Sequence, residues 1–382
     1  MKGLSHRLDH LQEYYFSQKL REVEELRAKG YPVINMGIGS PDLPPAPEVI
    51  EALKESASQV ASHGYQGYQG ILELRKAMSD FYAVHYRVEV DPQGEILPLL
   101  GSKEGIMHIS MAFLDVGDEV LVPDPGYPTY AAVTRMLQAV PRSYTLTSDN
   151  GWYPDFEALE KLDLSKVKLM WCNYPNMPTG AKATMEIFEK LVAFGRKHQI
   201  LIVHDNPYSF ILQENPLSIL QIEGAKDVAL ELNSLSKTSN LAGWRVGMVL
   251  GKKEWIHAIT KVKSNMDSGM FLGIQHGAIK ALQLGKEWYE SLNTVYATRR
   301  QLIWKLVDRL GLSYDREAVG MFVWAKVAEE VDARALVDEL LYQKHLFVTP
   351  GEVFGEQGRS YLRFSLCVSE QHIAEVLERF EQ

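Results

Sequence analysis

Short apolar runs alternate with segments of helical spacing along residues 47–285, and this alternation restricts the possible folds more than any other feature. The runs that predict strands are 95–100, 119–122, 168–172, 200–204, 228–232 and 246–250. Helices are expected between and after them, over 47–58, 71–86, 106–114, 184–198, 254–262 and 273–284. Strands that alternate with helices in this way predict an α/β unit.

The two ends of the chain have a different pattern. A helix over 11–29 and a short strand over 33–36 come first. The last third begins with a long helix, 287–310. It continues with strands over 321–327, 346–349 and 361–364 and with helices over 331–343 and 370–381. This part predicts a small α+β unit.

Composition narrows the class of protein. The 382 residues carry a net charge of −9 without a lysine- or arginine-rich run, which argues against a nucleic-acid partner. Residues 1–20 are charged throughout, so no signal peptide is expected, and no apolar run reaches membrane-spanning length. Cys172 and Cys367 are the only cysteines, too few for a disulfide framework. We therefore predict a cytoplasmic protein that does not associate with a membrane.

A lysine within a Ser/Thr-rich stretch, 233–247, indicates the chemistry. Lys237 follows the apolar run 228–232, and a desolvated lysine has a lowered pKa and attacks carbonyls. Nearby hydroxyls and a cation suit a phosphate; they come from Ser234, Ser236 and Arg245. The combination predicts a lysine that carries pyridoxal phosphate as a Schiff base. The alternative is a surface lysine in a polar loop.

Four other places have both a binding and a structural interpretation. The turn 101–105 opens a helix whose free N–H groups suit an anion, and Tyr127 follows a strand where α/β proteins place ligands. Asp205, directly after a strand, is either a helix N-cap or the partner of a buried cation. Arg363 lies in an apolar strand, paired with an acid or available to a carboxylate. The loop 64–70 is either a binding loop or a surface turn.

Taken together, the motifs resemble those of the class I/II aminotransferases, which are fold type I pyridoxal phosphate enzymes. In the family's order they are GIGSPD, YQGYQG, GSKEG, PDPGYPTY, NYPNMPTG, DNPY, SLSKTSNLAGWRVG, GMFVWAKV, TPGEVFG and YLRFSL. The resemblance implies a large cofactor-binding domain, 47–285, with a mainly parallel seven-stranded sheet flanked by helices. It implies a smaller α+β domain formed by 1–46 and 286–382.

The resemblance also assigns roles around the cofactor. Lys237 resembles the Schiff-base lysine, which also moves the substrate's Cα proton. Asp205 resembles the carboxylate that keeps the pyridine nitrogen protonated. Tyr208 resembles the phenol that binds O3′, and Tyr127 the aromatic ring that stacks on the pyridine.

Phosphate and substrate contacts follow in the same way. Ser102 and Lys103 resemble backbone donors to the phosphate at a helix start, and Ser234, Ser236 and Arg245 complete its binding site. Tyr65 would reach it from a partner subunit, which implies a homodimer with shared active sites. Gly39 and Arg363 resemble the pair that holds the substrate α-carboxylate. The side-chain pocket would draw on Tyr15, Ile38 and the loop 265–271, and this loop would come from either the same subunit or the partner subunit. No metal is expected.

One position departs from the family pattern. Met177 stands where the family usually has an asparagine that bonds O3′, and a thioether cannot donate a hydrogen bond. Either Asn176 replaces that asparagine, or Tyr208 binds O3′ alone.

The resemblance implies an aminotransferase that moves the amino group of an L-amino acid to 2-oxoglutarate or pyruvate by a ping-pong mechanism. Residues 263–269, with Phe271 and Gln275, resemble the branch of LL-diaminopimelate, alanine and aspartate aminotransferases. We find no second arginine placed for a distal carboxylate, which favours neutral side chains. A C–S β-lyase on the same fold is the alternative, because fold and cofactor do not determine the reaction.

Overall fold

The computed structural model describes residues 3–8 and 13–381. A seven-stranded sheet forms its centre, in the order β2-β8-β7-β6-β5-β3-β4. Strand β8 is antiparallel to both of its neighbours, and the other pairs are parallel. The strands are β2 (Ile96–Leu99), β3 (Glu119–Asp124), β4 (Val140–Thr145), β5 (Val167–Cys172), β6 (Leu201–Asp205), β7 (Ala229–Ser234) and β8 (Gly247–Leu250). The predicted α/β fold with a mainly parallel sheet is confirmed.

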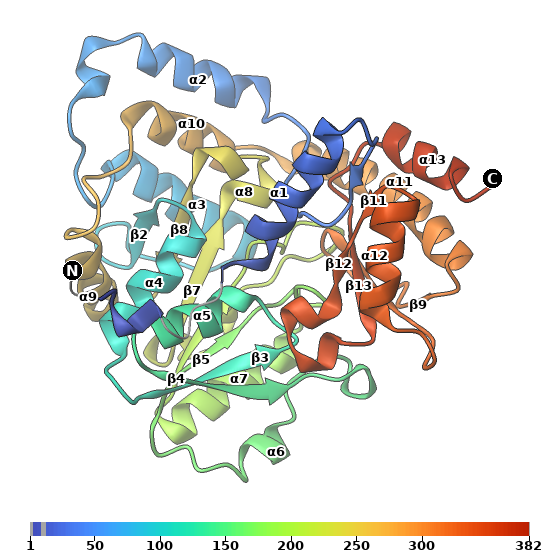
Figure 1. Cartoon of the computed structure of the whole chain (residues 1–382). Helices are drawn as coiled ribbons and strands as arrows, with labels where there is room; N and C mark the ends of the chain where they lie inside the picture. The colour runs from blue at the N-terminus through green and yellow to red at the C-terminus, as the bar shows by residue number, and fades with distance from the viewer. Residues whose placement is uncertain (1–2, 9–12, 382) are drawn as a thin grey trace.

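Helices cover both faces of this sheet (Figure 1). One face packs against α2 (Pro47–Ala57), α3 (Leu72–Tyr86), α7 (Met185–His198) and α10 (Leu272–Leu282). The other packs against α4 (Ser102–Phe113), α5 (Pro128–Met136) and α9 (Lys253–Lys263). Alternate strand residues enter the two cores, so that Met170 faces one and Leu169 the other. The short helices α6 (Phe156–Leu159) and α8 (Leu235–Thr238) complete this part of the chain.

The C-terminal part builds a second core. Its four-stranded antiparallel sheet has the order β12-β13-β10-β9, formed by β9 (Ser313–Tyr314), β10 (Phe322–Lys326), β12 (Thr349–Pro350) and β13 (Tyr361–Ser365). The helices are α11 (Lys286–Arg309), α12 (Ala333–Gln343) and α13 (Glu370–Glu378). Near the N-terminus, α1 (Tyr15–Ala28) precedes β1 (Ile34–Asn35), which pairs with β11 (Leu346–Phe347) in parallel.

Strand β1 therefore joins the N-terminal segment to the C-terminal part through β11, while the N- and C-termini lie at opposite sides of the view in Figure 1. Buried residues from Phe16 to Met36 share one cluster with residues from Leu292 onward. The domain boundaries at 46/47 and 285/286 remain a prediction. The predicted helix start at residue 11 lies outside the described residues. None of the described helices is long and apolar enough to cross a membrane.

Candidate active site

A cavity of about 540 Å³ lies between the carboxyl ends of the central strands and the small sheet. Tyr15, Tyr65 and the loop 265–271 do not line it. It brings together the other predicted site residues: Ile38, Gly39, Ser102, Lys103, Tyr127, Met177, Asp205, Tyr208, Ser234, Ser236, Lys237, Arg245 and Arg363. Parallel strands β5, β6 and β7 end at the same edge, so the loops after them meet there.

Lys237 enters the cavity from α8, directly after β7. Its ammonium donates a hydrogen bond to the carbonyl oxygen of Gly39. Gly39 is required for this close approach, because a Cβ at that position would overlap the ring of Phe322. Burial lowers the pKa of Lys237, and the guanidinium of Arg363 lowers it further. The structure therefore excludes the surface-lysine interpretation and provides an amine with an increased neutral fraction.

Asp205 ends β6 with its side chain buried in the cavity. One carboxylate oxygen, Oδ2, accepts a hydrogen bond of 2.8 Å from the hydroxyl of Tyr130. The other, Oδ1, is buried and has no partner among the described residues. Burial raises the pKa of Asp205 to about 6, although the bond from Tyr130 opposes the rise. Asp205 is not a helix N-cap, and its free oxygen suits a protonated ring nitrogen.

The opposite end of the cavity suits an anion. Helix α4 starts at Ser102 with no side chain capping its N-terminus, so its first N–H groups are available. Arg245 has a positive φ of 59° and lies against the Cα of Gly101, where a Cβ would overlap its guanidinium. Ser234 Oγ donates to Ser236 Oγ at 2.8 Å on the same side. A helix start, a cation and two hydroxyls suit a phosphate, and we refer to this group as the phosphate cup.

Arg363 projects from β13 and is buried among aromatic rings. Its Cζ lies 4.0 Å from the ring centroid of Phe322 and 4.5 Å from that of Phe354. Nη2 donates to Gly37 O at 2.7 Å, Nη1 donates to Met177 Sδ at 3.2 Å, and Nε is unpaired. No carboxylate among the described residues pairs with it. Burial lowers the pKa of Arg363 to about 10, so the site favours an incoming carboxylate.

The N-terminal helix corrects one expectation. Tyr15 does not line this cavity, and its side chain packs against two clusters, one with Val23 and Phe347 and one with Phe16. Its neighbours Tyr14 and Phe16 line the cavity instead. Sequence spacing alone does not show which side of the first turn faces the site. Tyr65 is 95% exposed and lies outside the cavity of its own chain.

The loop after β5 bears on the choice between Asn176 and Tyr208. Asn176 does not line the cavity, since its amide donates to Asn173 O and its oxygen accepts from Thr179. It is therefore not placed as a substitute for the asparagine that Met177 replaces. Asn173 lines the cavity and was missed by the sequence analysis. Its position directly after a buried strand could have indicated it. Tyr130 also lines the cavity and was not predicted, although it lies three residues after Tyr127 on a helix and so on the same side.

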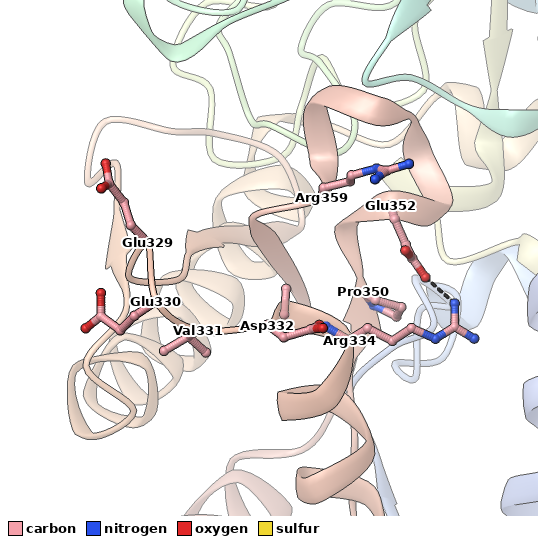
Figure 2. A pocket seen from close by; sticks show the side chains of 9 residues that line it. Glu329, Glu330, Val331, Asp332, Arg334, Pro350, Glu352 and Arg359 are labelled. Atoms are coloured by element: carbon pink, nitrogen blue, oxygen red, sulfur yellow. Dashed lines mark hydrogen bonds and ion pairs between the residues drawn. The ribbon is translucent and has the colours of Figure 1, made fainter.

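Two other groups of polar residues give weaker evidence for a binding site. Exposed charges of the C-terminal part line a separate hollow, where Arg334 pairs with Glu352 (Figure 2). Glu104, His108 and Asp267 have ligand atoms within 4.8 Å of one another. The ammonium of Lys263 already contacts both carboxylate oxygens of Asp267, at 2.7 and 2.8 Å. This cation takes the place that a metal ion would need.

An electron-poor ring with a phosphate at one end and a protonated nitrogen at the other fits this cavity, so the fold and site define a fold type I pyridoxal phosphate enzyme. The model of the family "Aminotransferase class I and II" matches residues 31–380. The chain belongs to the class I and II aminotransferase family.

Known relatives cover the chain almost completely. The LL-diaminopimelate aminotransferase of Aquifex aeolicus is 39% identical and covers 100% of this chain and 99% of its own length. The enzyme of that name from Oleidesulfovibrio alaskensis is 39% identical over 98% of each chain. Among solved structures, apo-BacF from Bacillus subtilis has a TM-score of 0.95 at 35% identity, covering 100% and 98% of the two chains. An aminotransferase from Staphylococcus aureus has a TM-score of 0.90 at 31% identity, covering 99% and 98%.

These findings establish that the protein is an aminotransferase that uses pyridoxal phosphate. The free oxygen of Asp205 and the phosphate cup at Ser102 and Arg245 fit the two polar ends of that cofactor.

Proposed function

We propose that the enzyme transfers the amino group of an L-amino acid to a 2-oxo acid, 2-oxoglutarate or pyruvate, by a ping-pong mechanism. The observation that carries this proposal is Arg363, a buried cation without a carboxylate partner in the same cavity as Lys237. Both donor and acceptor have a carboxylate next to the reacting carbon, so one arginine binds and orients both.

Bound pyridoxal phosphate supplies the electron-accepting ring on which an amino group is exchanged for a keto oxygen. Lys237 Nζ is neutral for part of the time and moves a proton from and back to the reacting carbons. Asp205 would hold a proton on the ring nitrogen, Tyr208 would bind the ring hydroxyl, and Tyr127 would contact the face of the ring. The phosphate would be bound by the backbone N–H groups of Ser102 and Lys103 and by the side chains of Ser234, Ser236 and Arg245.

Besides Arg363, the side chain of Lys103 offers a cation to a substrate, and its position supports a more specific proposal for the amino-group donor. Its Nζ lies 4.4 Å from the ring centroid of Tyr14, and both residues line the cavity. A lysine at this point favours substrates with a distal carboxylate, which revises the expectation of neutral side chains. The curated relatives are named LL-diaminopimelate aminotransferases, and that amino acid has such a carboxylate. We therefore propose LL-diaminopimelate as a donor.

Two further expectations remain proposals. The exposure of Tyr65 supports a homodimer in which this tyrosine reaches the phosphate of the partner's site. Met266 and Phe271, at 58% and 37% exposure, lie on the loop that we expect at the same interface. The cytoplasmic location also remains a prediction.

The test is a set of half-reactions followed by absorbance. The loaded enzyme is mixed with LL-diaminopimelate, glutamate, alanine or aspartate, and loss of the pyridoxal band identifies the donors. Adding 2-oxoglutarate or pyruvate should restore the band. Release of pyruvate and ammonia from cystathionine without any 2-oxo acid would instead establish the C–S β-lyase.

A further inference from the structure

Glu231 is a fully buried acid on β7, the strand that leads to Lys237. Its carboxylate accepts hydrogen bonds from the hydroxyls of Tyr82 at 2.7 Å and Ser218 at 2.8 Å. The N–H of Ile219 donates at 3.0 Å. So many donors stabilise the charged form of a buried carboxylate, and the predicted mechanism gives Glu231 no role.

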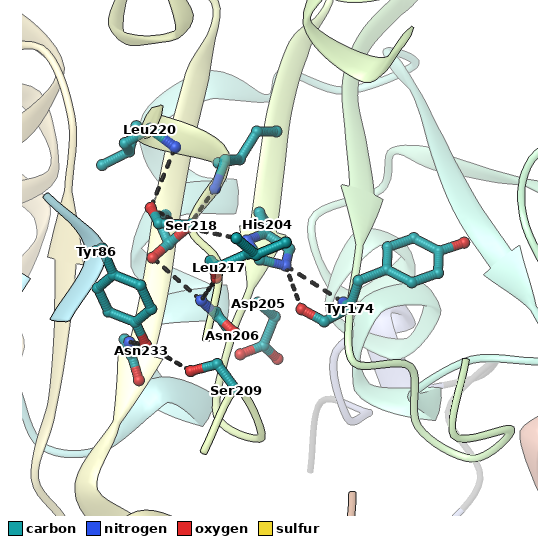
Figure 3. A network of polar contacts seen from close by, with 12 residues as sticks. Tyr86, Tyr174, His204, Asp205, Asn206, Ser209, Leu217, Ser218, Leu220 and Asn233 are labelled. Atoms are coloured by element: carbon teal, nitrogen blue, oxygen red, sulfur yellow. Dashed lines mark hydrogen bonds and ion pairs between the residues drawn. The ribbon is translucent and has the colours of Figure 1, made fainter. Parts of the chain in front are cut away.

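His204 lies next to this acid on the neighbouring strand. Its Nδ1 lies 3.0 Å from Glu231 Oε2, and its Nε2 lies 2.8 Å from the carbonyl oxygen of Tyr174 (Figure 3). A carboxylate and a carbonyl oxygen both only accept, so each of the two short contacts requires a proton on the ring nitrogen. The N–H of Tyr174 is farther from Nε2, at 3.3 Å. The geometry therefore indicates an imidazolium paired with a carboxylate inside the sheet.

This ion pair connects two parts of the cofactor site. His204 immediately precedes Asp205, and Asn206 follows it and donates from Nδ2 to Glu231 Oε1 at 3.3 Å. On the other side, Tyr174 is adjacent to Asn173, whose Nδ2 donates to Asp205 O at 2.6 Å. Glu231 thus holds the residues on both sides of Asp205 and, through His204, the loop after β5.

The charge of His204 also acts on Asp205. Burial raises the pKa of the Asp205 carboxyl to about 6, and the positive charge of His204 opposes that rise. Asp205 shares the cavity with four cationic residues: Lys103, Lys237, Arg245 and Arg363. Burial raises the pKa of each of the other titratable groups around the three residues: Tyr82, Tyr86, Tyr130, Cys172, Tyr174 and Tyr208. They stay neutral at neutral pH, so the Glu231–His204 pair sets the local charge behind Asp205.

We propose that Glu231 is a positioning residue of the active site, which keeps His204 protonated and so keeps Asp205 ionised for the cofactor's ring nitrogen. This inference rests on the proposed role of Asp205. Without the negative charge of Glu231, a proton on His204 is no longer stabilised. Asp205 then becomes protonated at a higher pH than in the wild type, because the neighbouring positive charge is lost.

The experiment measures cofactor affinity and not turnover. Full-length protein is titrated with pyridoxal 5′-phosphate between about pH 5 and pH 8, and the dissociation constant is followed by absorbance. In the wild type, affinity should fall on the acid side as Asp205 becomes protonated. In Glu231→Gln the pH midpoint of this loss of affinity should be higher by at least about half a pH unit, and binding at neutral pH should be several-fold weaker.

Two variants separate charge from packing. Tyr82→Phe removes a neutral donor from the same carboxylate, so it should lower the melting temperature and leave the pH midpoint unchanged. The double variant Glu231→Gln with His204→Gln replaces the ion pair by two amides and should reproduce the shift even if Glu231→Gln folds poorly. An unshifted midpoint in both charge-removing variants, or an equal shift in Tyr82→Phe, overturns the inference.

Asp205→Asn distinguishes the inference from the function on which it rests. This variant should bind the cofactor weakly at every pH of the series. Wild-type affinity in Asp205→Asn would refute the proposed role of Asp205 and the inference with it. If Asp205→Asn binds the cofactor weakly and the pH midpoint of Glu231→Gln is unchanged, only the inference about Glu231 is refuted, and the proposed role of Asp205 stands.

Discussion

The sulfur of Met177 accepts a hydrogen bond from Nη1 of Arg363 at 3.2 Å. The residue that departs from the family pattern therefore contacts the proposed carboxylate-binding arginine and not only the expected position of the cofactor. The thioether is a weak acceptor, so it orients the guanidinium without neutralising it. Arg363 keeps its charge available for a substrate.

We predict that Met177→Leu raises KM for amino-acid donors by roughly two- to fivefold and changes kcat by less than about twofold. Leucine fills a similar volume and removes the acceptor, so the guanidinium is held less firmly. Steady-state kinetics with two donors measures both constants. Met170→Leu, in the core of the large sheet, is the matched control and should leave KM unchanged. A KM equal to that of the wild type in Met177→Leu would show that the sulfur contact has no orienting role.

Arg363→Lys should lower kcat/KM for every amino acid by roughly 100-fold, because an ammonium cannot form the paired hydrogen bonds of a guanidinium. Pyridoxal phosphate should still bind, since Arg363 is separate from the phosphate cup. The measurement combines steady-state kinetics with the absorbance of the bound cofactor. Arg300→Lys, on α11 beside Trp304, is the control and should retain full activity. If kcat/KM fell for only one amino-acid donor, Arg363 would instead recognise the side chain of that donor.

Lys237→Met should stabilise the cofactor-free protein at neutral pH. Burial lowers the pKa of Lys237 in the folded state, so the unfolded chain binds this proton more tightly. The protonated lysine therefore costs stability below its folded pKa, and the cost disappears as pH rises past the usual value of 10.5. We expect a melting temperature higher by about 2 °C or more at pH 7, with the difference shrinking toward about pH 11.

Thermal melts of cofactor-free wild type and Lys237→Met at several pH values test this prediction. Lys305→Met changes an exposed lysine on α11 and should have no such effect. If Lys237→Met melts at or below the wild-type temperature, the stability lost with the hydrogen bond to Gly39 exceeds the stability gained by no longer burying an ammonium.

Mixing Tyr65→Phe with Arg363→Ala should restore activity if the active sites are shared. Tyr65 is exposed in its own chain, so a hybrid dimer would contain one site with both native residues. Activity is measured after subunit exchange has been verified by a tag on one variant. Tyr68→Phe, in the same loop and 47% exposed, serves as the control that should be active alone. Confirmed exchange with no return of activity would argue against sharing.

Local patterns predicted most of the central sheet, because buried parallel strands appear as apolar runs between helices. Strand β4 was missed, since Val140–Thr145 is an edge strand with mostly exposed or half-buried side chains. The position of Lys237 after a buried strand and of Arg363 within one was likewise visible from neighbouring residues. The aromatic surroundings of Arg363 were not, because Phe322 and Phe354 reach it only through sheet pairing and chain crossing.

The sequence alone determined the α/β class, the family and most of the predicted residues that line the cavity, since these depend on local burial patterns and on motifs in a set order. The tertiary structure decided which neighbours share the site. It placed Tyr14 and Phe16 rather than Tyr15 at the cavity, and it joined Glu231 to His204 across two strands. Such contacts depend on how a helix docks and which strands become neighbours, and a residue's immediate sequence carries no record of either.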